Sequence, residues 1–113
     1  MTHYMHLADE PFIKIKEGKK NIELRLFDEK RALISPGDEI VFSCRNSDEM
    51  VSARVTNLHI FDSFRELYMV LPLIKCGYDP AEVGNATYTD MDKYYSAEQQ
   101  EKYGVVGIEF DLI

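Results

Sequence analysis

Apolar and polar residues alternate along several short stretches of this chain, which is the period-two pattern of strands that place one face on a core. In the clearest stretch, residues 21–27, the apolar positions are separated by Glu23 and Arg25. Turn sequences at 35–38 and 46–48 separate further stretches. We also interpret these as strands: residues 39–44, 51–60 and 105–110. Gly107, inside the last of them, predicts a bulge or a close backbone approach.

Short helices are predicted between the strands from their capping signals. Residues 10–17 have a proline in the first turn and are followed by Gly18. Ser63 and Ser96 each precede Glu or Gln by three positions, the spacing of a capping box. Residues 77–88 are expected to be an irregular loop or a short turn of helix. Because the regular helical crossovers of a parallel sheet are missing, we predict an α+β fold. It would be a small, mostly antiparallel β-barrel with flanking short helices, formed by residues 1–113 as a single domain.

Charge bears on the partners that this chain can have. Twenty Asp and Glu residues against thirteen Lys and Arg give a net charge of −7, and the isoelectric point is near 4.9. Proteins that coat a nucleic-acid duplex have the opposite balance, so we expect no extended DNA duplex as a partner. A basic cluster of seven residues is the candidate anion-facing surface, or else solvated ends of a helix and a turn. Its members are Lys14, Lys16, Lys19, Lys20, Arg25, Lys30 and Arg31.

The sequence lacks the features of membrane and secreted proteins. No apolar run approaches the roughly 18 to 20 residues that span a bilayer, and residues 1–10 lack the basic and then hydrophobic order of a secretion signal. Cys44 and Cys76 are far apart and form no CxxC motif, so we expect small buried thiols. A cytoplasmic protein without a membrane partner is the expectation.

Motifs of several enzyme and cofactor classes are also missing. There is no GxSxG nucleophile turn, no phosphate-binding P-loop and no dinucleotide fingerprint, because the six glycines are scattered. His3 and His6 have a spacing that suits a metal, but they lie in a starting segment that we expect to be mobile. His59 has no neighbouring cluster of possible ligands. We therefore expect no cofactor and no metal.

Residues 18–25 gather polar groups at one place. Lys20 falls at the predicted helix-to-strand turn, and Glu23 and Arg25 share one face of the following strand. The three side chains can converge at one mouth of a barrel and hold the edge of a base. Glutamate accepts from amines, arginine donates to carbonyl or phosphate oxygens, and lysine supplies a mobile charge. The alternative is an exposed strand face whose ion pair contributes little to stability.

The same segment, Gly-Lys-Lys-Asn-Ile-Glu-Leu-Arg, fits the pattern G-x-K-x-x-E-x-R, and on this motif the chain resembles the ASCH domain family of the PUA-like superfamily. The resemblance continues through residues 36–38, 61–64 and 103–110, and the chain looks like the stand-alone ASCH proteins of bacteria. It implies a small β-barrel with a cleft in which the motif faces RNA or a nucleotide-like ligand.

Binding of RNA or a modified nucleoside is the first function that the resemblance implies. The cleft would use Gly18, Lys19, Lys20, Glu23 and Arg25, with Lys19 as a phosphate contact. An acidic chain is better suited to a small ligand or a short single strand than to a long duplex. One or two tyrosines would stack on a base. The candidates are Tyr78, Tyr88, Tyr94 and Tyr95.

Hydrolysis is the second implied function. A branch of the family that resembles this chain removes the acetyl group of N4-acetylcytidine with a lysine, a threonine and a glutamate. The lysine corresponds to Lys20, and the threonine position is occupied by Glu23. The glutamate position falls near Pro72, where Glu66 is the nearby acid. Lys20 and Glu23 would then be the catalytic groups, with Glu23 as a general base acting on a nucleoside or on RNA.

Two mutational expectations separate these functions from a purely structural or protein-interaction domain. If the site is catalytic, Lys20→Met abolishes turnover with little change in melting temperature, because we expect the site to be exposed. If the domain is only structural, Lys20→Ala and Glu23→Ala change neither binding nor turnover.

Overall fold

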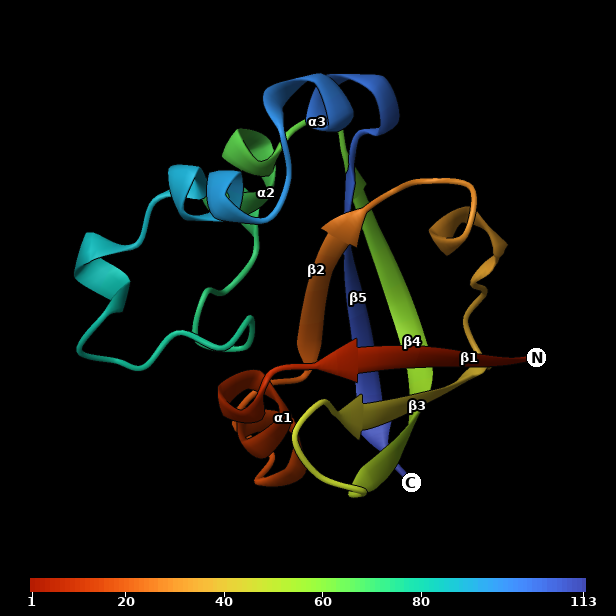
Figure 1. Cartoon of the computed structure of the whole chain (residues 1–113). Helices are drawn as coiled ribbons and strands as arrows, with labels where there is room; N and C mark the ends of the chain where they lie inside the picture. The colour runs from red at the N-terminus through yellow and green to blue at the C-terminus, as the bar shows by residue number, and fades with distance from the viewer.

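A five-stranded sheet forms the centre of the protein, in the strand order β1-β3-β4-β5-β2. The computed structural model describes residues 1–113, and its curled sheet with short helices around it is shown in Figure 1. The strands are β1 (Thr2–Leu7), β2 (Ile22–Leu26), β3 (Glu39–Cys44), β4 (Met50–Phe61) and β5 (Val105–Leu112). The β1–β3 pair is parallel, and the other three pairs are antiparallel. The predicted α+β, mostly antiparallel barrel-like fold is therefore confirmed.

The start of the chain differs from the prediction. Thr2–Leu7 is not a mobile segment but an edge strand paired with β3 over its whole length, with Thr2 opposite Glu39 and Leu7 opposite Cys44. Met5 and Leu7 are buried in the core. The strand depends on a partner more than thirty residues away. Its two histidines make the alternation of apolar and polar residues hard to recognise in the sequence.

The helices are short and begin where the capping signals predict. They are α1 (Asp9–Lys16), α2 (Phe64–Val70) and α3 (Ala97–Tyr103), with 3₁₀ turns at η1 (Arg31–Leu33), η2 (Val83–Asn85) and η3 (Tyr88–Lys93). The Ser63 side chain accepts from the Glu66 amide at the start of α2. The capping box of α3 is complete. None of these helices has the length and apolarity needed to cross a membrane.

Two apolar clusters divide the interior. The first lies between the sheet and α1 and contains Phe12, Phe42 and Phe110. The second joins β2 to α2 and η3 through residues such as Leu24 and Leu67. Strand β5 contributes to both, because its alternate side chains point to opposite faces.

Gly107 in β5 lies close to Leu71, the residue that follows α2. A Cβ atom there would lie 2.6 Å from Leu71 Cδ1 and 3.2 Å from Ile22 Cγ2. Side chains, and not another backbone segment, therefore approach Gly107 closely, and the irregularity in register lies in β4, between Val55 and Asn57.

Candidate functional site

Lys20, Glu23 and Arg25 meet in one ion-paired cluster, here called the triad. Lys20 Nζ lies 2.8 Å from Glu23 Oε1. Arg25 holds the other carboxylate oxygen with two nitrogens, Nη2 at 2.8 Å and Nε at 2.9 Å from Glu23 Oε2. Both oxygens of Glu23 are thus engaged, and the prediction that the three side chains converge is confirmed by these contacts.

Local structure explains why the triad forms at this place. Helix α1 ends at Lys16, and Gly18 has φ +80°, a left-handed conformation that favours glycine and turns the chain towards β2. The Lys20 side chain then passes over Gly77, where a Cβ atom would lie only 3.0 Å from Lys20 Cδ. A residue with a side chain at position 77 would therefore press against the lysine of the triad.

Glu23 is buried and its two partners are only slightly exposed, so the expectation of an exposed site is wrong. The exposed fractions of the side chains are 11% for Lys20, 6% for Glu23 and 16% for Arg25. Glu23 lies opposite Ile108 and Arg25 opposite Val106 in the β2–β5 register, and both partners belong to the first apolar cluster. The polar face of β2 is therefore packed largely against the core, and only small parts of Lys20 and Arg25 still contact water.

Electrostatics keep Glu23 ionised despite this burial. Desolvation alone would raise the pKa of Glu23, but the charges and hydrogen bonds of Lys20 and Arg25 outweigh it, and the pKa is lowered. A carboxylate with a lowered pKa and two occupied oxygens is a weak proton acceptor. Its structural effect is to hold the two cations in fixed positions.

The triad lines a cleft of about 630 Å³. Four tyrosines share this lining: Tyr68, Tyr78, Tyr94 and Tyr95. Tyr94 is exposed, with 64% of its surface accessible, whereas Tyr95 stacks on Phe64 with ring centroids 6.1 Å apart. Of the four predicted aromatic candidates, Tyr88 does not line the cleft. Tyr68 lines it but was not among the candidates.

A hydrogen-bonded chain forms a second polar feature of the cleft. The Tyr78 hydroxyl donates to Asp90 Oδ2 at 2.8 Å and lies 2.7 Å from the Tyr68 hydroxyl. Asp90 also accepts from the Thr87 amide in a capping box at η3. This chain ties the segment that carries η3 to α2. The sequence signal for it was the Thr87-to-Asp90 spacing, which matches a capping pattern.

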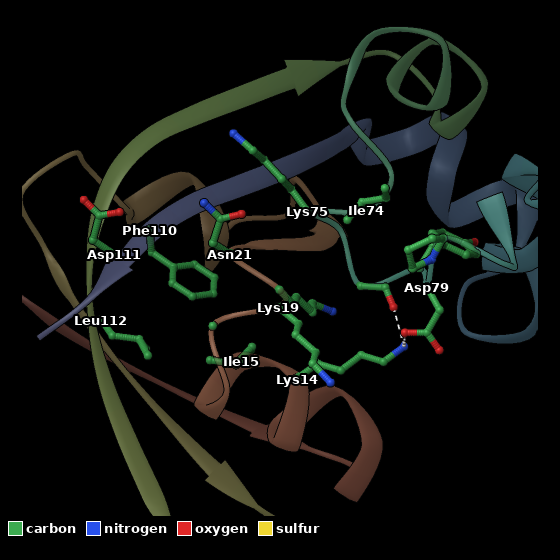
Figure 2. Close-up of a pocket in the computed structure, with 15 residues that line it drawn as sticks. Lys14, Ile15, Lys19, Asn21, Ile74, Lys75, Asp79, Phe110, Asp111 and Leu112 are labelled. Atoms are coloured by element: carbon green, nitrogen blue, oxygen red, sulfur yellow. Dashed lines mark hydrogen bonds and ion pairs between the residues drawn. The ribbon is translucent and has the colours of Figure 1, made fainter.

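Gly18 and Lys19 lie outside the cleft. They line an adjacent hollow of about 690 Å³, here called the lysine pocket, which shares Lys14, Lys20, Gly77 and Tyr78 with the cleft. Figure 2 shows Lys14 reaching towards Asp79 across this pocket. Lys14 donates to the Gly77 carbonyl at 2.6 Å. Lys19 pairs with Glu17 and is 66% exposed, so the structure does not bring it to the triad.

The other candidate residues have partners elsewhere. His3 contacts Asp38 at 2.8 Å, His59 contacts Glu109 at 2.8 Å, and no group of three His, Cys, Asp or Glu side chains is placed to hold a metal ion. Cys76 is buried as expected, but Cys44 is only half-buried. Glu66 is exposed on α2 and does not line the cleft.

Comparison with known proteins agrees with this architecture. The crystal structure of hypothetical protein PH0355 is similar over 100% of both chains, at 35% identity and a TM-score of 0.81. The NMR structure of protein PF0455 from Pyrococcus furiosus covers 100% of this chain and 98% of its own, at 37% identity and a TM-score of 0.63. A mutant ASCH protein from Zymomonas mobilis shares the fold, at 13% identity and a TM-score of 0.64, over 97% of this chain and 67% of that one.

No curated protein matches this chain. A family model described as the ASCH domain matches residues 5–113. Since this match covers nearly the whole sequence, the chain belongs to the ASCH domain family.

Proposed function

We propose that this ASCH domain binds either a short single-stranded segment of RNA or a modified nucleoside, and that the ligand is held in the cleft. The observation that carries the proposal is the buried triad, in which one carboxylate fixes two cations beside a tyrosine-lined cleft. Membership of a PUA-like family associated with RNA supports the same conclusion.

The triad is suited to donating hydrogen bonds to a ligand. Glu23 already accepts from both neighbours, while Arg25 Nη1 has no partner within the protein and Lys20 has ammonium protons to spare. Donors held in place before binding lose less conformational entropy when a ligand arrives. Carbonyl oxygens and ring nitrogens of a base, or a phosphate oxygen, are the acceptors that such donors favour.

The aromatic lining supplies the second element of nucleotide recognition. Bases in single-stranded RNA stack on tyrosine rings, with a contribution of about 1 to 3 kcal/mol per base. Tyr94 is the best placed for this because it is exposed and lines the cleft. A net charge of −7 is consistent with a ligand that makes few phosphate contacts.

Adjacent lysines provide a matched test. Affinity for a short single-stranded RNA and for a panel of modified nucleosides, including N4-acetylcytidine, is measured by calorimetry at several salt concentrations. Lys20→Ala and Arg25→Ala should weaken binding, and for the RNA they should lower its salt dependence. Lys19→Ala, which removes the same charge one residue away, should change little. Equal effects of Lys19→Ala and Lys20→Ala, or an unchanged salt slope in both triad variants, would refute binding at the triad.

A hydrolase is the second candidate, and the contact between Lys20 and Glu23 favours it, because both proposed catalytic groups lie in the cleft. The lowered pKa of Glu23 weighs against its action as a general base. Incubation of the same nucleosides with the protein and with Lys20→Ala, followed by chromatography and mass spectrometry, decides the matter. Product that forms only with the unmodified protein means hydrolysis, and no product from either refutes hydrolysis of these nucleosides.

A further inference from the structure

The hydrogen-bonded chain in the cleft has a fixed direction. A carboxylate only accepts, so the single proton of the Tyr78 hydroxyl goes to Asp90. The Tyr78 oxygen must then be the acceptor in its contact with Tyr68, and the proton between the two tyrosines comes from Tyr68. With its proton used, the Tyr68 oxygen retains only lone pairs.

Burial preserves this direction over the physiological pH range. Desolvation is the largest cause that raises the pKa of Tyr78 and the pKa of Tyr68. Both hydroxyls therefore keep their protons, and neither becomes a phenolate that would reorder the chain. The nearly perpendicular packing of the two rings, at 78° and 6.0 Å between centroids, also keeps them in place.

We propose that the Tyr68 hydroxyl is a specificity determinant of the cleft, which accepts a hydrogen bond from an N–H group of the bound nucleobase. This inference rests on the proposed function. The triad offers donors, since both oxygens of Glu23 are occupied. Tyr68 adds an acceptor to the same cleft. A base that presents both an acceptor and an N–H group can contact the triad and Tyr68 together. Cytosine, adenine and guanine do so, because each has an amino N–H group as well as a ring-nitrogen or carbonyl acceptor.

Methylated nucleosides test the direction of this contact. Adenosine, N6-methyladenosine and N6,N6-dimethyladenosine have two, one and no amino N–H groups, and the monomethyl compound controls for added bulk. The same measurement is repeated with cytidine and N4,N4-dimethylcytidine. The protein should bind each N–H-bearing compound about 3- to 10-fold more tightly than its dimethylated counterpart, the range expected for one hydrogen bond.

Tyr68→Phe removes the acceptor and keeps the ring. It should reduce the ratio of affinities for N–H-bearing and dimethylated nucleosides to about one. Binding of the N–H-bearing compounds should weaken, while binding of the dimethylated ones should not change. Tyr88→Phe is the matched control, because Tyr88 lies outside the cleft, and it should retain the full preference. Melting temperatures show that each variant is folded.

The outcomes also separate this inference from the proposed function. If the protein binds nucleosides in a Lys20-dependent way but shows no preference for N–H-bearing compounds, or if the preference survives Tyr68→Phe, the role of Tyr68 is refuted and the binding function stands. If no nucleoside or RNA binds, both are refuted.

Discussion

Replacing Glu23 by glutamine removes one negative charge while preserving the shape of the side chain. The amide can accept from one cation only, and its NH₂ group then points a donor at the other. Lys20 and Arg25, with side chains 11% and 16% exposed, would be left side by side with no compensating charge. Removing one partner of a buried ion pair typically destabilises a protein by about 3 to 5 kcal/mol, and we expect Glu23→Gln to fall in this range.

The comparison with Lys20→Ala makes this expectation specific. In that variant Arg25 still neutralises Glu23 through the Nε hydrogen bond and the Nη2 ion-pair contact, so the loss should be smaller, about 1.5 to 3 kcal/mol, the contribution of a hydrogen bond to a charged group. Lys19→Ala should be nearly neutral. Urea unfolding monitored by circular dichroism gives the free energy of unfolding of all three variants. Equal m-values are the check on two-state behaviour. If Lys20→Ala destabilises the protein more than Glu23→Gln, the carboxylate does not hold the triad together.

Three further predictions concern other parts of the molecule. Asp38 has its pKa lowered from 3.8 to about 2 by hydrogen bonds from His3 and the Ser35 amide. The Asp38 carboxylate thus stabilises the folded state fully above pH 3.8, and this stabilisation is lost as the pH falls towards 2. Asp38→Asn should therefore make the free energy of unfolding less dependent on pH in this range, as measured by acid unfolding. Gly107→Ala should destabilise the fold by about 1 to 3 kcal/mol through the clash with Leu71, and Leu71→Ala should recover part of the loss; no recovery in the double variant would contradict the clash. Burial raises the pKa of Cys76 to about 12, so an aromatic disulfide reagent should modify Cys44 in the native protein and reach Cys76 only in denaturant.

The strands and helices that local pattern governs could be predicted from the sequence. The alternation around Glu23 and Arg25 predicted β2, and the serine caps predicted α2 and α3, because both signals lie within a few neighbouring residues. Strand β1 could not be recognised in this way. It is defined by its pairing with β3, a contact between distant segments that leaves little trace in the local sequence.

The candidate site shows the same division. The spacing of Lys20, Glu23 and Arg25 predicted their convergence, but not their burial, which depends on the opposing residues of β5. Tyr68 and Asp90 were missed because the contact that joins them passes through Tyr78, on a loop without regular periodicity. Gly18 is a fixed position of the motif and Lys19 is a variable one, yet both line the lysine pocket and not the cleft.

The order of the strands has a consequence for how the protein folds. Strand β2 is joined to the sheet only through β5, which follows it by more than seventy residues and lies between β2 and β4. Pairing of such distant segments is slow and entropically demanding. The triad therefore acquires its frame only when β2 pairs with β5, and any opening of β5 releases β2 as well. In hydrogen exchange the amides of these two strands should form one cooperative unit.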